Sequence, residues 1–141
     1  MQAIIGKQFP KIIIPKIDEA KQSIKIIVFD WRWYANDPGN PVQLFNQALV
    51  RAVRRGVRVQ AVVNYPTLVE TLKKIGVEAK KISSTNLVHA KLIIIDDTAC
   101  IVGSHNFSVP AFTTNFEVSL FCDIIEIAEE LSKFFDSLWQ L

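Results

Sequence analysis

Cysteine and long apolar runs are both scarce in this sequence, and each shortage excludes a class of protein. The two cysteines, Cys100 and Cys122, form no CxxC pair and lie inside apolar segments, so neither a disulfide framework nor a zinc site is indicated. No apolar run approaches the roughly 18 residues that a membrane-spanning helix needs. The first residues, MQAIIGKQFPKIII, lack the pattern of a secretion signal. We therefore expect a soluble, cytoplasmic protein that has no stable association with membranes.

The composition fits one folded domain that spans residues 1–141. Of these residues 50% are hydrophobic and only 21% are charged, which is typical of a globular chain with a sizeable core. The net charge of +2 permits a polyanionic substrate but does not demand one.

Apolar segments that are typical of strands alternate with amphipathic segments that are typical of helices. We expect strands near residues 2–6, 24–30, 57–64, 77–82, 88–95, 99–102 and 117–122, and helices near residues 12–23, 41–55, 66–75 and 124–138. An order of strand, helix and strand favours parallel neighbours joined by crossovers. The sequence therefore predicts an α/β fold in which a mixed, largely parallel sheet is sandwiched by helices, with one domain per chain.

Proline and capping residues mark three of the expected helix starts. Pro15 then lies in the first turn of the first helix, where its missing N–H matters little. Asn40 is expected to cap the second helix, with Pro41 at the first helical position. Asp123 is expected to cap the last helix, and Glu126 completes a capping box three positions later.

The most informative stretch runs from residue 89 to residue 117. His89 and Lys91 stand two positions apart in an apolar segment, and residues i and i+2 of a strand share a face. An imidazole beside a fixed positive charge suits nucleophilic attack on an anionic phosphodiester. Asp96 has the opposite parity and follows at the end of the strand.

A polar loop comes after the next apolar segment, which stops at Gly103. Ser104, His105 and Asn106 carry hydroxyl, imidazole and amide groups that can donate to phosphate oxygens, and we assign all three to substrate binding together with the Lys91 ammonium. Glu117 should return to the same end of the sheet, where a carboxylate can hold a histidine tautomer. One acidic residue offers too few ligands for a metal ion, so we expect neither a metal nor another cofactor.

These residues stand in the order H-x-K-x4-D, G-S-x-N and N-x-E, which resembles the signature of the phospholipase D superfamily, the HKD phosphodiesterases. The chain has a single HKD motif. From about residue 10 to residue 140, its order of elements is similar to that of the small single-motif endonucleases of the superfamily. The resemblance implies a metal-independent reaction at a site that two copies of the chain share.

By this resemblance His89 is the nucleophile that becomes phosphohistidine, and the partner's His89 protonates the leaving oxygen. Lys91 and Asn106 of both subunits hold the phosphate. The resemblance also implies that Ser104 orders the pocket and that Glu117 hydrogen-bonds the histidine.

Asp96 completes the motif, and it is counted among the candidate catalytic residues although the resemblance implies a largely structural role for it. We predict a homodimeric nuclease that acts on DNA or RNA. Two alternatives stay open. One is a phospholipid phosphodiesterase, although a short chain leaves little room for an acyl pocket, and the other is a nucleic-acid-binding module without activity.

Residues 31–34 form an aromatic stretch after the second expected strand. Trp31 and Trp33 fit the role of core anchors, because indole rings are large and apolar. This role as core anchors is the favoured one, and the alternative is the rim of a substrate groove, where rings stack on unpaired bases and Arg32 contacts a phosphate. All three residues are therefore candidates for substrate binding.

Overall fold

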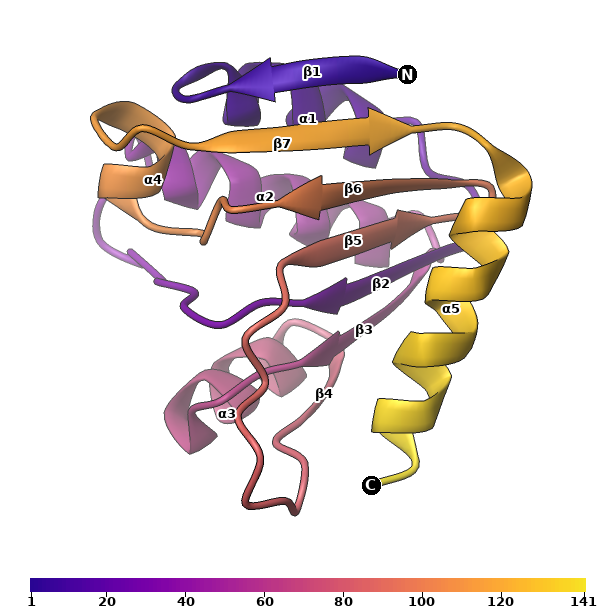
Figure 1. The fold of residues 1–141 in the computed structure, drawn as a ribbon. Helices are drawn as coiled ribbons and strands as arrows, with labels where there is room; N and C mark the ends of the chain where they lie inside the picture. Colours follow the sequence, from indigo (N-terminus) through magenta and orange to yellow (C-terminus); the bar gives the residue numbers. More distant parts are fainter.

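Seven strands form one mixed sheet in the order β1-β7-β6-β5-β2-β3-β4 in the computed structural model, which describes residues 1–141 (Figure 1). The strands are β1 (Gln2–Ile5), β2 (Ser23–Ile27), β3 (Arg58–Val62), β4 (Glu78–Lys80), β5 (Leu92–Ile95), β6 (Ala99–Gly103) and β7 (Val118–Cys122). The helices are α1 (Gln8–Asp18), α2 (Pro41–Arg54), α3 (Pro66–Lys74), α4 (Val109–Thr113) and α5 (Ile125–Trp139).

Strand direction divides the sheet into two halves. β2, β3 and β4 are parallel and are joined by helical crossovers, as predicted. The pairings β2–β5, β5–β6, β6–β7 and β1–β7 are antiparallel. The sheet is thus mixed, as predicted, but its parallel share is smaller than predicted. The connection 96–98 between β5 and β6 is long enough only for a hairpin, whereas parallel strands need a crossover of roughly a dozen residues.

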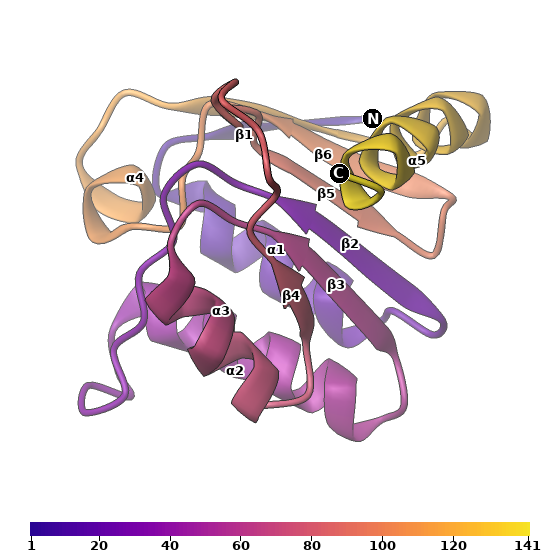
Figure 2. The same ribbon diagram turned by 90° about the horizontal axis from the view of Figure 1, so that it is seen from below.

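The helices cover the two faces of the sheet unequally (Figure 2). The helices α1, α2, α3 and α4 pack on one face over a core of 29 buried residues, with Phe9, Phe45 and Leu72 among them. The helix α5 alone packs on the other face, over nine buried residues around Phe135. The predicted helix–sheet–helix sandwich is confirmed. None of the helices combines the length and the apolar character that crossing a bilayer requires.

The predicted helix starts hold in one of three cases. The Asn40 side chain accepts the amide of Val42 at 2.9 Å, so the cap of α2 is confirmed. In contrast, α1 begins at Gln8 and contains Pro15 in its interior, because the buried stripe of the helix already starts at Phe9. The predicted capping box of α5 is also wrong: Asp123 lies before the helix, and its carboxylate pairs with the N-terminal ammonium at 3.1 Å.

Candidate active site

One end of the sheet collects all the candidate catalytic residues except Asp96. The strand register places Ile27, the last residue of β2, beside Leu92 at the start of β5. It also places Gly103, the last residue of β6, beside Ser119 of β7. The segments that leave β2, β3 and β6 therefore meet those that enter β5 and β7, at the end where α4 lies in Figure 1.

His89 and Lys91 lie side by side on the segment that leads into β5. Lys91 Nζ is 3.2 Å from His89 Nδ1 and 3.4 Å from His89 Nε2. The sequence predicts a strand over residues 88–95, but β5 starts only at Leu92. The exposed imidazole of His89 therefore lies before the hydrogen-bonded part of the strand. Phe29, just beyond β2, contacts both side chains: its ring centroid is 4.8 Å from that of His89 and 5.6 Å from Lys91 Nζ. The two predicted groups are thus together and open to solvent.

Asn64, just beyond β3, ties the His89 segment to the exit of β2. Its side-chain amide donates to the carbonyl of Phe29 at 3.1 Å and to the carbonyl of Val88 at 3.0 Å. One amide therefore fixes the backbone before His89 against the residue whose ring contacts the imidazole. No sequence pattern indicates this role, because the two acceptors are 35 and 24 residues away.

Ser104, Asn115 and Glu117 form a second cluster at the same end of the sheet. The Ser104 hydroxyl donates to Glu117 Oε1 at 2.6 Å, and Asn115 Nδ2 donates to Glu117 Oε2 at 3.0 Å. Glu117 makes no hydrogen bond to His89 of the same chain, so that implied contact is not made within one chain. Lys91 and Gly103, the residue before Ser104, line one small cavity of about 10 Å³.

Asn106 joins the loop after β6 to the segment after β2. Its Oδ1 accepts the backbone amide of Asp30 at 3.1 Å, which leaves its side-chain NH2 group free to donate. The backbones pair as well: the Arg32 amide donates to the Phe107 carbonyl at 2.9 Å, and the Phe107 amide donates to the Asp30 carbonyl at 3.0 Å. The free amide of Asn106 is therefore rigidly placed, as a phosphate-holding group needs to be.

His105 is not available to a substrate, and its assignment to substrate binding is wrong. The side chain is buried, with Nδ1 2.7 Å from Ser119 Oγ and Nε2 2.9 Å from the carbonyl oxygen of Gly6. Its ring stacks on Phe9 with 4.5 Å between centroids. Burial lowers the pKa of His105, and the Gly6 carbonyl and the Glu117 charge oppose this only in part. The x position of G-S-x-N, occupied by His105, thus faces the core.

Asp96 lies at the opposite end of β5, and its assignment as a catalytic residue is wrong. Its carboxylate accepts the backbone amides of Lys21, Gln22 and Ser23 at 2.7 to 3.2 Å, which joins β5 to the start of β2. Burial raises the pKa of Asp96, but these hydrogen bonds outweigh it and the net pKa is lowered. A whole strand separates Asp96 from His89, so its role is structural, as the family resemblance implies.

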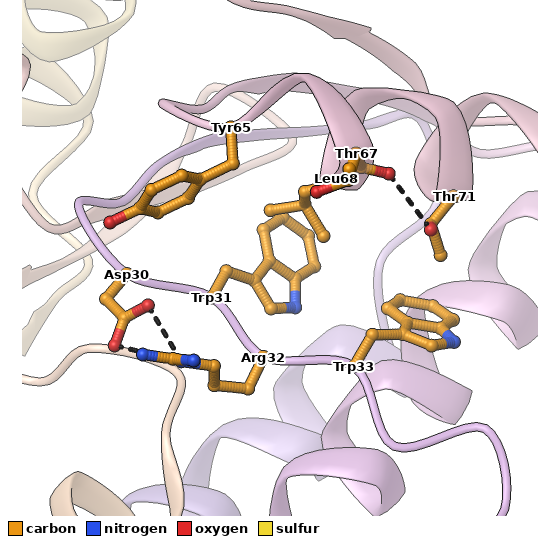
Figure 3. Close-up of a pocket in the computed structure, with 8 residues that line it drawn as sticks. All are labelled: Asp30, Trp31, Arg32, Trp33, Tyr65, Thr67, Leu68 and Thr71. Carbon is orange, nitrogen blue, oxygen red and sulfur yellow. Dashed lines mark hydrogen bonds and ion pairs between the residues drawn. The ribbon is translucent and has the colours of Figure 1, made fainter.

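The aromatic stretch after β2 divides between the core and the surface. Trp31 is only 3% exposed and donates its indole N–H to Asn46 Oδ1 at 2.7 Å, so its assignment as a substrate-stacking ring is wrong. Arg32 and Trp33 instead border a pocket of about 350 Å³ (Figure 3). The pocket is lined by Asp30, Trp31, Arg32, Trp33, Tyr65, Thr67, Leu68 and Thr71. The residues from Tyr65 onward belong to the start of α3, which no motif in the sequence links to the site.

A second groove, of about 340 Å³, also borders His89. It lies between residues 82–90 and the last turns of α5, and its apolar lining includes Leu87, Phe134, Leu138 and Leu141. Leu87 and Leu141 are more than half exposed. The expectation that the chain has little room for an acyl group is therefore not met.

A known family accounts for this arrangement. The family model described as "Cardiolipin synthase, PLD-like domain" matches residues 13–139. The chain belongs to this phospholipase D-like family. The match covers both halves of the sheet and the whole HKD stretch, so the resemblance seen in the sequence is confirmed.

Several curated proteins are relatives of this phospholipase D-like chain. The mitochondrial cardiolipin hydrolase of Xenopus laevis is 30% identical over 100 residues, which are 67% of this chain and 48% of that protein. The phospholipase D of Rickettsia conorii is 31% identical over 127 residues, 84% of this chain and 58% of that protein. The chain thus spans about half the length of these curated relatives.

Solved structures show the same phospholipase D-like fold. Nuc from Salmonella typhimurium, described as a phospholipase D family member, has a TM-score of 0.81 at 22% identity, over 99% of this chain and 94% of that one. NucT from Helicobacter pylori has a TM-score of 0.79 at 20% identity, with the same coverage of both chains. The predicted phospholipase D-like fold is confirmed.

Proposed function

We propose that the chain is a metal-independent phosphodiesterase that cleaves nucleic acids. The observation that carries the proposal is the approach of the Lys91 ammonium to within 3.2 Å of the His89 imidazole on an exposed segment. A neutral imidazole is a nucleophile, and the ammonium beside it can bind the anionic oxygens of a phosphodiester.

The chemistry proceeds in two displacements. A ring nitrogen of His89 attacks phosphorus, so a P–N bond forms while the P–O bond to the leaving oxygen breaks. Lys91 and the free amide of Asn106 hold the non-bridging oxygens, on which negative charge accumulates. Water then attacks the phosphohistidine, which restores the imidazole, so one molecule of water is consumed for each bond cleaved.

We further propose that the site is completed by a second copy of the chain. In-line displacement places the leaving oxygen opposite the attacking nitrogen, so His89 cannot also protonate that oxygen. The only other imidazole, that of His105, is buried, and both its nitrogens already have partners. This favours the partner's His89 as the general acid, because a twofold axis brings the same residue of two chains together.

The substrate assignment rests on the surface beside the nucleophile. The segment that begins with Phe29, in contact with His89, continues through Asp30 and Arg32 to Trp33. Arg32 is exposed and is held by the Asp30 carboxylate at 3.0 Å. The Arg32 guanidinium and the Trp33 indole, three and four residues after the Phe29 that contacts His89, are the kinds of charged and aromatic groups that bind nucleic-acid strands.

A phospholipid is the second candidate substrate, favoured by the apolar groove that also borders His89. Its leucine side chains and Phe134 offer an apolar surface to an acyl chain. His89 and Lys91 could attack the phosphodiester of a lipid in the same way as that of a nucleic acid. The two candidates therefore differ in which wall beside His89 binds the rest of the substrate.

The test is an activity panel with the purified chain in EDTA, using single-stranded DNA, structured RNA, plasmid DNA, and vesicles of phosphatidylcholine or cardiolipin. We expect cleavage of nucleic acid, an acid-labile adduct after rapid quenching in which a strand fragment is bound to the protein through phosphorus, and neither with His89→Ala. Turnover of vesicles alone would transfer the activity to the lipid. Activity that disappears with EDTA and returns with Mg²⁺ would refute the phosphohistidine mechanism. Strand binding without cleavage would leave a binding module.

A further inference from the structure

The pocket shown in Figure 3 has the build of a binding site for a single planar group. Its volume of about 350 Å³ falls at the lower end of the range of ligand sites. Two partly exposed rings, Trp33 and Tyr65, line it from different elements, and the buried Trp31 lies between them in Figure 3. The first turns of α3 close the opposite side with Thr67, Leu68 and Thr71.

Polar groups in this pocket are free for a ligand. The indole N–H of Trp31 is taken by Asn46, and the Thr71 hydroxyl donates to the carbonyl of Thr67 at 3.1 Å. In contrast, the indole N–H of Trp33, the phenol of Tyr65 and the hydroxyl of Thr67 have no hydrogen-bond partner within the chain. Rings that offer stacking surface and free donors beside them suit a heterocyclic base.

The charge of the pocket favours a neutral group with a phosphate at its rim. The Asp30 carboxylate is paired with Arg32 Nε at 3.0 Å, so the inner part of the pocket carries little net charge. The Arg32 side chain is 61% exposed, and its terminal nitrogens make no bond within the chain, so they are open to a phosphate. A base therefore fits inside the pocket while the phosphate attached to it stays near Arg32.

The pocket and the nucleophile are parts of one rigid unit. Asp30 lines the pocket, and its amide is held by Asn106, which lies in the loop after β6. Tyr65 follows Asn64, whose side chain donates to the carbonyls of Phe29 and Val88. The Phe29 ring contacts His89, and Val88 is the residue before His89. The pocket thus lies one or two residues along the chain from groups that contact the site.

We propose that this pocket binds the base of an unpaired nucleotide that flanks the scissile phosphate. The inference rests on the proposed nuclease function and adds its substrate class. In a duplex both faces of each base are covered by neighbouring pairs, so only a single strand, a loop or a frayed end can place a base in this pocket against Trp33 or Tyr65.

The test measures binding in the His89→Ala background, so that the strand stays intact. The probes are a fluorescent single-stranded oligonucleotide, the same sequence as a duplex, and a strand of equal length made of abasic residues. Loss of one stacked base corresponds to a roughly 5- to 150-fold weaker Kd. We expect Trp33→Ala and Tyr65→Ala each to weaken binding of the single strand by a factor in this range. Neither should alter binding of the duplex or the abasic strand.

Two further variants separate stacking from charge. Arg32→Ala should reduce the slope of log K against log salt by about one for every strand, whereas Trp33→Ala should leave that slope unchanged. Leu44→Ala is the matched control: Leu44 is 48% exposed, close to the 44% of Tyr65, and lies on α2 outside the pocket. Its binding constants should equal those of the parent. Melting curves of each variant show whether the fold is intact.

The outcomes separate the pocket from the nuclease function. If the chain with His89 cleaves the strand but Trp33→Ala and Tyr65→Ala bind it as tightly as the parent, the pocket proposal is overturned and the nuclease function stands. Equal losses on the abasic strand would also overturn it, since no base is then being bound. If the strand is bound through the pocket but never cleaved, the pocket stands and the nuclease function falls. A chain that neither binds nor cleaves any strand removes both.

Discussion

The Ser104 hydroxyl spans the ends of β6 and β7 to donate to the Glu117 carboxylate at 2.6 Å. Because Asn115 holds the second carboxylate oxygen at 3.0 Å, Glu117 has a fixed orientation without a hydrogen bond to His89 of its own chain. This is the arrangement expected of a carboxylate that is prepared for a partner from outside the chain, and the shared site proposed above supplies an imidazole for that purpose.

Loss of the Ser104 hydroxyl should therefore lower turnover although Ser104 forms no bond in the reaction. We expect Ser104→Ala to reduce kcat about 10- to 100-fold, which is typical for groups that orient a catalytic residue, with KM nearly constant. Ser104→Thr, which keeps a hydroxyl, should recover much of the loss. Steady-state kinetics over a range of pH measure both effects. Equal kcat values for Ser104→Ala and the parent would show that the Glu117 orientation is irrelevant to catalysis.

The shared site predicts a distinct response to mixed chains. When equal amounts of parent and His89→Ala chains are unfolded and refolded together, about half of the parent chains enter mixed dimers. Activity per parent chain should fall to about half, and the active species should weigh twice the 15.9 kDa of one chain. A monomer would keep its full activity per parent chain and would run at the single mass.

His105→Ala should affect stability and spare the chemistry. The substitution removes the ring that stacks on Phe9 and leaves the Ser119 hydroxyl and the Gly6 carbonyl without their partner, which we expect to cost roughly 2–4 kcal/mol of unfolding free energy. The remaining folded protein, quantified by circular dichroism, should keep most of its turnover. A folded His105→Ala protein as inactive as His89→Ala would make His105 the general acid.

Gly103 should tolerate no side chain, because β6 and β7 approach closely at this point. A Cβ on Gly103 would lie 2.3 Å from Ser119 Oγ and 2.4 Å from the carbonyl oxygen of Val118. We expect Gly103→Ala to lower the free energy of unfolding by about 1–3 kcal/mol, measured by urea denaturation. Gly39→Ala is the control, since a Cβ there meets nothing within 4 Å. Equal midpoints for the two variants would contradict the close approach.

Asp96 should make the fold sensitive to acid. Its lowered pKa means that the unfolded chain takes up a proton before the folded chain does, so its contribution to stability is present above the unfolded pKa, about 4, and is lost as the pH falls through the folded value. Asp96→Asn should cost about 1–3 kcal/mol at pH 7 and less at pH 2. Urea denaturation of both proteins at several pH values gives the difference. A constant difference at all pH values would show that the charge of Asp96 is not what the three amides recognise.

Most of the candidate catalytic residues could be placed at one end of the sheet from sequence, because they lie on short segments next to regular strands. His89 and Lys91 are two residues apart, and the hairpin from β5 to β6 returns the chain at once, so the spacing of the HKD stretch nearly determines the site. Strand direction was harder to predict. The crossover rule describes β2, β3 and β4, but it does not apply to the antiparallel half that carries the motif.

Burial was the part that the sequence could not resolve. Trp31 and Trp33 are the same residue type two positions apart, yet one is enclosed by the core and the other borders a pocket. His105 stands between two polar site residues but turns toward Phe9. The pocket itself combines Arg32 with Tyr65, and only the folding of β2 and β3 side by side brings these residues together.

Asn64 fixes the separation between the proposed nucleophile and the proposed base pocket. Its one amide group holds the carbonyls next to the nucleophile and next to the pocket at 3.0 and 3.1 Å, so neither segment can shift without the other. A base seated in the pocket lined by Trp33 and Tyr65 would then always place the same backbone linkage in front of His89. Cleavage would then follow at a constant number of nucleotides from the bound base, whatever the sequence of the strand.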